Sequence, residues 1–342
     1  MWIYILLQQN GVLSDFFGSN FSFNYEKYLI DLGIVDSLRL KIESGELDEF
    51  GHPKLIAMRS ILQNLSGTLY IDSMSNKSGR KNFPAYPTFV SRKEAYIYYD
   101  NQSVYNGVYK RDKFYFKIDP FTLDSLDNFV TGSLAFDGDF NSAGIFPMFR
   151  EKAIIMPDHS FGFEQNTPPE GYAAYGGKGR YFNHLDLSFN GLQGKGKVDY
   201  LSSITLSDHF LFFPDSTNAA PGQFEMRNET IAGTAFPQAD GKDVSLNWQP
   251  YKDRMYIYKS TDDLALYNKK VTLDGSLVLT PKGLRGNGKA FYTESDLTSK
   301  NLYFETEGYG ADTSDFNLRS ADRELMAIST KNVKSKDRKS VV

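Results

Sequence analysis

Apolar and polar residues alternate along several short stretches of the chain. Between Lys113 and Ile118, every second position carries Phe or Ile, with Tyr or Lys between them. This period of two is typical of a β-strand with one buried face. Similar runs, bounded by turn-forming residues, occur at Thr68–Asp72, Ala95–Tyr99 and Met255–Lys259. The pattern predicts a mainly β fold.

One segment near the N-terminus has a helical spacing instead. His52-Pro53 would open a helix, with proline at the first helical position, and Ser66-Gly67 would end it. We therefore expect residues 1–66 to form a mixed α/β segment, incomplete at its start, that contains a short helix. The apolar residues at intervals of three or four are Leu55, Met58, Leu62 and Leu65.

The chain repeats itself at an offset of 92 residues. Residues 185–227 and 277–319 align without gaps, and the matches are mainly turn glycines and apolar strand residues. Such a repeat propagates an architecture, and arrays of this kind present surfaces or grooves. The identical pairs are Leu185/Leu277, Leu187/Leu279, Gly191/Gly283, Leu192/Leu284, Gly194/Gly286, Gly196/Gly288, Lys197/Lys289, Tyr200/Tyr292, Ser203/Ser295, Ser207/Ser299, Phe212/Phe304, Ala219/Ala311, Phe224/Phe316 and Arg227/Arg319.

Each copy is expected to fold into four strands. Asn190-Gly191 and its counterpart Pro281-Lys282-Gly283 favour tight reversals, so the first two strands of each copy should be antiparallel. Gly194 and Gly196 fall inside the second strand, where glycine marks a bulge or a close backbone approach. The strands expected in the first copy are Leu185–Phe189, Lys195–Leu201, Thr205–Phe213 and Phe224–Arg227.

A loop and a weaker sequence repeat complete the expected organisation of the chain. Residues 213–222 are rich in Pro, Asn and Ser and predict a loop excursion inside the first copy. Gly132–Phe136 echoes Gly275–Leu279, so a third, degraded copy is a further hypothesis. We expect residues 67–320 to be an all-β repeat region. Its repeated antiparallel meanders would form an extended, curved sheet or a β-solenoid-like array.

Composition narrows the functional classes. The chain has 342 residues, of which 15% are aromatic and none is cysteine. The aromatic content favours strands, and the lack of cysteine excludes disulfides, thiolate metal sites and cysteine nucleophiles. A net charge of −4 and a pI near 5.7 give no general attraction to nucleic acid, so we expect no such partner.

The two ends carry separate expectations. Met1–Asn10 has an apolar run but neither a basic start nor a small-residue cleavage site, so we expect no signal peptide there. At the other end, Asp337–Val342 looks like a translated sequencing adapter. We expect residues 321–342 to be a tail in which 337–342 are not native, the alternative being an ordinary basic tail.

No catalytic or metal-binding motif stands out. Gly191–Gly196 is glycine-rich but lacks the Lys-Ser/Thr ending of a phosphate-binding loop. The histidines have no metal-ligand spacing, and we expect His159 and His209 to cap turns. We therefore expect no metal and no cofactor, and we favour a non-enzymatic role. The four histidines are His52, His159, His184 and His209.

An acidic stretch begins like a calcium-binding loop. Asp137, Asp139 and Asn141 would supply oxygen ligands, but Met148 stands where such a loop needs a bidentate carboxylate. A polar hairpin is therefore the preferred interpretation. The chain has 42 Asp and Glu residues, so an acid pair suited to glycoside hydrolysis stays open, although no pair is singled out.

Three aromatic residues are candidates for facing a ligand: Trp248, Tyr256 and Tyr258. Exposed aromatic rings can stack on sugars. The same residues could equally be cross-strand partners on a sheet face. A carbohydrate-binding or carbohydrate-active β-domain, with glycans as ligands, is therefore the alternative function.

The Gly-x-Gly strand, the apolar alternation and the repeat resemble the repeating β-groove proteins. These include the AsmA-like and translocation-and-assembly-module proteins of Gram-negative envelopes, and the resemblance covers residues 130–320. It implies antiparallel meanders stacked into a long curved sheet with an apolar concave face. Leu277–Gly288 and Ala311–Arg319 also resemble large uncharacterised Bacteroidota repeat proteins, which imply no particular activity.

The resemblance implies a non-enzymatic repeat protein of the cell envelope or surface. It would lie in the periplasm or at the outer membrane and act as a scaffold or as a lipid-handling β-groove. Lipids or other envelope proteins would be its partners. The chain departs from a lipid conduit in its mean hydropathy of −0.42, which is polar overall.

Overall fold

The computed structural model describes residues 2–9, 12–47, 49–51, 53–126, 134–318 and 333–335. Strands make up 63% of the chain and helical residues 2%. Every pairing between described strands is antiparallel. The helical elements in these ranges are two single 3-10 turns, η1 (Tyr105–Gly107) and η3 (Pro250–Lys252). The expected mainly β, antiparallel fold is confirmed.

The chain forms two compact units. The first unit comprises Met1–Glu164 and Asp186–Gly191, and the second comprises Gln165–Leu185 and Leu192–Val342. The division expected after residue 66 falls inside a strand of the first unit. The strands up to the end of the first unit are β1 (Trp2–Gln9), β2 (Val12–Asn24), β3 (Leu29–Leu47), β4 (Pro53–Ala57), β5 (Leu62–Tyr70), β6 (Thr88–Ser91), β7 (Ala95–Tyr98), β8 (Phe114–Ile118), β9 (Thr122–Leu123), β10 (Ala135–Ser142), β11 (Phe149–Ile155) and β12 (Phe161–Asn166).

Aromatic rings fill the core of the first unit. Phe114 and Phe116 on β8 are fully buried, and Phe140 of the paired strand β10 packs against both, with ring centroids 5.2 and 6.4 Å apart. Tyr115 and Lys117, on the other face of β8, are only half-buried. The alternation expected between residues 113 and 118 is therefore confirmed.

The helix expected near the N-terminus is wrong. Its residues form strands β4 and β5 instead, and His52 lies outside the described residues. Asn64 on β5 has a left-handed conformation (φ 61°), and the ladder between β3 and β5 shifts register beside it. Such an irregularity moves the alternation by one position. Leu62 and Leu65 therefore share one buried face at a spacing of three, which imitates a helix.

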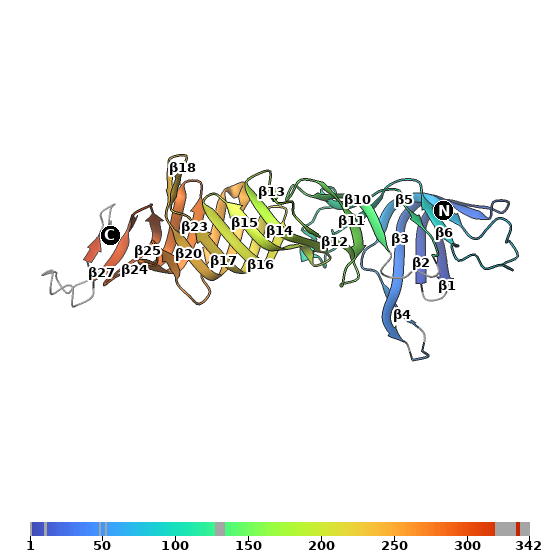
Figure 1. Ribbon diagram of the computed structural model, residues 1–342, viewed down its shortest axis with the longest axis horizontal. Coiled ribbons are helices and arrows are strands. Elements are labelled where there is room, and N and C mark those ends of the chain that lie inside the picture. Colours follow the sequence, from blue (N-terminus) through green and yellow to red (C-terminus); the bar gives the residue numbers. More distant parts are fainter. Residues whose placement is uncertain are drawn as a thin grey trace. The chain divides into compact units, whose positions relative to one another are not determined.

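The strands from β13 onward form the second unit's meander (Figure 1). β15, β16, β17 and β20 pair in that order, β20 pairs with β21 and β22, and both of these pair with β23. β24, β25, β26 and β27 continue the sheet, while β18 and β19 form a separate hairpin. These strands are β13 (Tyr172–Ala174), β14 (Gly179–Ser188), β15 (Gly191–Tyr200), β16 (Ser203–Phe213), β17 (Ser216–Met226), β18 (Glu229–Ile231), β19 (Thr234–Phe236), β20 (Ala239–Gln249), β21 (Arg254–Tyr258), β22 (Leu264–Leu266), β23 (Val271–Thr280), β24 (Gly283–Tyr292), β25 (Ser295–Phe304), β26 (Tyr309–Ala311), β27 (Ser314–Leu318) and β28 (Val333–Ser335).

The sequence repeat is also a repeat of structure. β13, β14 and β15 have the same bounds as β22, β23 and β24 at an offset of 92 residues. Both copies carry a register shift at one place, between Gly194 and Gly196 in the first and between Gly286 and Gly288 in the second. The expected bulge and the expected antiparallel meander are confirmed. The correspondence also reaches upstream of residue 185, because β13 matches β22.

One expected loop is a strand. Residues 213–222 make a tight turn and then enter β17 at Ser216. Thr217 and Ala219 are buried while Ser216, Asn218 and Pro221 are not, so the Pro/Asn/Ser-rich composition belongs to the solvated face of a strand. Gly132 lies outside the described residues, so the third copy stays a prediction.

The inward face of the second unit's sheet is packed with its own side chains. Val244, Leu246 and Trp248 on β20 and Leu277 and Leu279 on β23 are at most 3% exposed. Burial of this apolar surface is the main force that holds such a sheet together. At these five positions, side chains of the chain itself therefore leave no room for a ligand on the inward face.

Candidate functional site

Trp248, expected to face a ligand, belongs to the core of the second unit. It is fully buried, and its ring centroid lies 5.3 Å from that of Tyr175 and 5.2 Å from that of Tyr200. Across the ladder it pairs with Thr217 on β17. Burial raises the pKa of Tyr200 to about 12, because a phenolate is poorly solvated there. The expectation is wrong for Trp248, since the alternation along β20 turns it inward.

Tyr256 and Tyr258 lie on the outer face of β21. Their rings stack with centroids 6.3 Å apart and planes 8° from parallel. Tyr258 is exposed and Tyr256 is half-buried, so solvent reaches both. Their role as ligand-facing aromatics stays a prediction.

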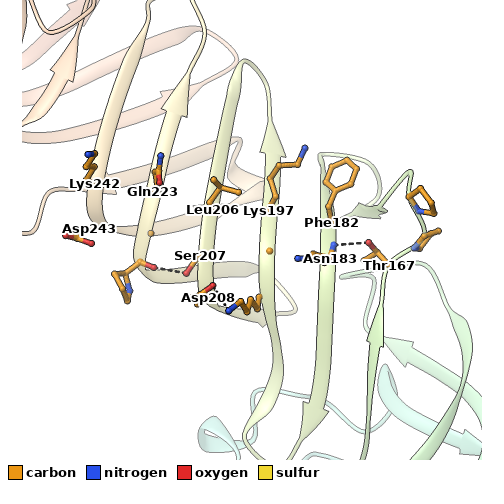
Figure 2. Close-up of a pocket in the computed structure, with 16 residues that line it drawn as sticks. Thr167, Phe182, Asn183, Lys197, Leu206, Ser207, Asp208, Gln223, Lys242 and Asp243 are labelled. Atoms are coloured by element: carbon orange, nitrogen blue, oxygen red, sulfur yellow. Dashed lines mark hydrogen bonds and ion pairs between the residues drawn. The ribbon is translucent and has the colours of Figure 1, made fainter.

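An open groove on the outer face of the second unit is the candidate site. It has a volume of about 840 Å³ and crosses β14, β15, β16, β17 and β20 (Figure 2). Thr167 and two prolines from the loop after β12 close one end, and β20 forms the other. The residues of this outer groove are Thr167, Pro168, Pro169, Phe182, Asn183, Lys195, Gly196, Lys197, Leu206, Ser207, Asp208, Pro221, Gly222, Gln223, Lys242 and Asp243.

A line of backbone irregularities runs beneath the outer groove. The β15–β16 ladder shifts register between Gly194 and Gly196, and the β17–β20 ladder shifts on both sides of Gly222. Asn183 and Asp243, on the outermost strands, have positive φ angles of 94° and 50°. Bulges bend strands and increase their twist. We attribute the concavity of the outer face to this line.

Glycine is required where the line crosses β15. A Cβ on Gly196 would lie 2.1 Å from the carbonyl oxygen of Phe182 and 2.7 Å from the Cβ of Asn183. The equivalent Gly288 has a φ of 140°, and its Cβ would lie 2.2 Å from the carbonyl oxygen of Asp274. In both copies, close approach of the neighbouring strand depends on the missing side chain.

Paired charges occupy the middle of the outer groove. The Lys195 ammonium lies 3.2 Å from the Asp208 carboxylate, and Lys197 lies 3.2 Å from Asp199. The ammonium of Lys197 also sits 4.0 Å from the centre of the Phe182 ring, a cation–π contact. Because Lys197 covers this ring, Phe182 is not a free stacking platform for a sugar.

The β20 end of the outer groove carries unpaired charges. The side chains of Lys242 and Asp243 are exposed and make no hydrogen bond or ion pair with any residue that the structure describes. Adjacent cationic and anionic groups on an open surface can bind a ligand rich in hydroxyl or amide groups. This end is the part of the outer groove most available for binding.

The second copy does not reproduce the chemistry of the outer groove. In the second copy, Lys259 lies between Asp263 and Asp274, 2.7 and 2.5 Å from their carboxylates, so charges at this level are neutralised within the chain. Several positions that line the outer groove differ between the copies, although Lys197 is retained as Lys289. The differing pairs are Phe182/Asp274, Lys195/Asn287, Leu206/Thr298, Asp208/Lys300 and Gln223/Asp315.

The acidic stretch at residues 137–144 is a hairpin, as preferred. Asp137 and Asp139 lie on β10 and pair with Lys152 and Arg150 of β11 at 4.0 and 3.4 Å. Across the described ranges, no group of three His, Asp or Glu residues is placed to hold a metal ion. Basic side chains of β11 therefore lie against both carboxylates.

The three histidines that the structure describes, His159, His184 and His209, form no group that could hold a metal ion. His159 lies in a turn with a φ of 61°, as expected. His209 lies within β16 rather than at a turn, so the expectation for it is wrong. Its backbone N–H donates to the hydroxyl of Ser207 at 3.0 Å, which secures the irregular part of the strand.

Sequence reasoning missed most of the outer groove. Phe182, Lys242 and Asp243 belong to no motif, and their common position depends on pairing between distant strands. The local signal that did exist was Gly194-x-Gly196, which marked the bulge on which the outer groove is built.

Comparison with known proteins adds no family to this picture. No family model, curated protein or solved structure matches the chain. In the part of the chain that the structure describes, no helix is both long enough and apolar enough to cross a membrane.

Proposed function

We propose that the chain is a non-enzymatic repeat protein of the cell envelope or cell surface that acts as a scaffold. The proposal is carried by what its two copies share. Retained glycine, serine and tyrosine residues shape the backbone, whereas most of the side chains that line the outer groove differ. A repeated architecture with variable outer faces is typical of scaffolds that present surfaces.

A tyrosine fastens the same turn in each copy. The hydroxyl of Tyr175 lies 2.8 and 2.7 Å from two carbonyl oxygens that flank the turn between β16 and β17. The equivalent Tyr267 meets the two carbonyl oxygens that flank the gap between β25 and β26. A hydroxyl in this position can donate to a carbonyl group beside the turn, which stabilises the turn.

A serine fastens the bulge in each copy. Ser207 donates its hydroxyl proton to the carbonyl oxygen of Pro221 at 2.7 Å and accepts the N–H two residues later. Ser299 does the same, with the carbonyl oxygen of Thr313 at 2.6 Å. These paired contacts support a scaffold because they maintain shape and leave the outward residues free to vary.

A scaffold is preferred to a lipid-handling groove because the inward residues along β20 and β23 are buried. Leu246, Leu277 and Leu279 are almost completely buried, so an acyl chain would have to displace packed side chains. The envelope location rests on the resemblance of the Gly-x-Gly strand and the repeat to the repeating β-groove proteins.

Native mass spectrometry of the purified full chain is expected to give the mass of the polypeptide alone. The reason is that the chain's own side chains occupy the inward face along β20 and β23. Organic extraction of the same sample, followed by lipid chromatography, checks that a labile lipid was not lost in the spectrometer. One or more lipid molecules retained per chain would overturn the scaffold and favour the groove. Detection in the cytosolic fraction of the source cells would overturn the envelope location.

A second candidate function is carbohydrate binding at the outer groove. The observation in its favour is the β20 end, where Lys242 and Asp243 have no partner among the described residues. Sugar hydroxyls donate to carboxylates and accept from ammonium groups. Trp248 takes no part in this candidate, since it is buried.

For this candidate, Asp243→Asn and Lys242→Met are each expected to weaken glycan binding about tenfold, the loss of one charged hydrogen bond. Glycan arrays followed by calorimetry on any ligand found provide the measurement. Lys282→Met, which removes an exposed turn lysine from the second copy, is the matched control and should bind normally. Equal binding by all variants would remove the outer groove as the glycan site.

A further inference from the structure

A pocket of about 520 Å³ lies beside β26 in the second unit. Tyr267, Val271, Tyr292 and Tyr309 line it together with backbone and polar groups. Tyr309 is 2% exposed, and its hydroxyl has no hydrogen-bond partner among the described residues. Burial raises the pKa of Tyr309 to about 12, as it does for Tyr200 in the first copy. We call this space the second-copy pocket.

The same place in the first copy is filled by Trp248. At the offset of 92 residues, the four lining residues correspond to Tyr175, Gly179, Tyr200 and Thr217, and all four surround this tryptophan. The rings of Tyr175 and Tyr200 lie 5.3 and 5.2 Å from it, and Thr217 is its partner in the ladder. A Cβ on Gly179 would lie 2.6 Å from the Cη2 atom of the indole.

Trp248 reaches this place from the next strand of the sheet. β20 pairs with β17 as far as Thr217, which carries the tryptophan over the two tyrosines. In the second copy, β28 pairs with β27 from Ser314 to Phe316, and the described part of this ladder does not extend to Tyr309. Within the described ranges, β26 pairs with β25 alone, so its other edge is open.

We propose that the second-copy pocket is a seat for a bulky apolar side chain from a β-strand that adds to the open edge of β26. The strand would be a further member of the same array, placed as β20 is placed on β17. Val271 and Tyr309 are larger than their counterparts Gly179 and Thr217, so the seat fits phenylalanine better than an indole. The inference rests on the proposed scaffold function. It adds a mechanism by which one copy binds the next strand of the array.

A graft of β20 residues onto the end of the full chain tests the proposal. In the graft, residues 336–342 are replaced by the sequence of residues 245–251, with phenylalanine in place of Trp248. Ser335 pairs with Ser314 as Val244 pairs with Gly222, so the graft continues the register of β20. We expect the melting temperature of the second unit to rise by about 5 °C and amide exchange at residues 309–311 to slow about tenfold.

A matched graft with serine at the phenylalanine position isolates the seat. It can form the same backbone ladder but leaves the pocket unfilled, so it should give less than half of both effects. Equal effects from the two grafts would overturn the proposal, as would the absence of protection in either. Analytical ultracentrifugation at several protein concentrations distinguishes strand addition within one chain from dimerisation through the same edge. Dimerisation would also overturn the proposal. The mass-spectrometric test of the scaffold uses the unmodified chain, so the two proposals can fail separately.

Discussion

Replacing Trp248 by alanine is expected to lower the free energy of unfolding of the second unit by about 3–5 kcal/mol. The indole is fully buried between Tyr175 and Tyr200, and its removal leaves a cavity walled by two rings and the β17–β20 ladder. Backbone pairing on both sides prevents these walls from closing inward. Urea denaturation followed by circular dichroism should show a lower midpoint with the same dependence on denaturant.

Tyr258→Ala is the matched control for this substitution. It removes an aromatic ring from the neighbouring strand β21 at a position that is 46% exposed. Its effect should stay within about 0.5 kcal/mol, as for other exposed positions. A normal unfolding midpoint for the Trp248 variant, together with lost glycan binding, would instead restore the idea that this tryptophan faces a ligand.

The repeat could be predicted from the sequence because its signals are local. Gly191 and Gly283 mark the same hairpin turn in two chemical forms, and Gly196 and Gly288 mark the same bulge. Each signal involves a few consecutive residues, and the second copy confirms the first. The positions of the β-strands follow from these turns and bulges, because the strands between them can pair in only a few registers.

The features that could not be predicted depend on register. The spacing of Leu62 and Leu65 resembles that of a helix because Asn64 shifts the alternation of a strand. No neighbouring residue in the sequence marks this shift. Trp248 was expected outside because one residue of register decides which face a strand residue occupies. Lys242 and Asp243 meet Phe182 along one groove only after five strands have paired, so their common site has no local signature.

Gly196→Ala is expected to destabilise the second unit by about 3 kcal/mol, because the added methyl group overpacks two paired strands. Its Cβ would lie 2.1 Å from the carbonyl oxygen of Phe182, and backbone cannot yield as a flexible side chain does. The strands would have to separate at the level of the bulge, which would also flatten the outer groove. The measurement is again the midpoint of urea denaturation.

Gly222→Ala is the matched control for the Gly196→Ala substitution. Gly222 also lines the outer groove and also lies in a strand, but its added Cβ would meet its nearest neighbours at 3.5 Å, an ordinary contact. Both substitutions restrict the unfolded chain equally, so the difference between them isolates the clash in the folded state. If both variants unfolded at the same midpoint, the carbonyl of Phe182 would be free to move. The glycine shared by both copies would then reflect something other than close strand approach.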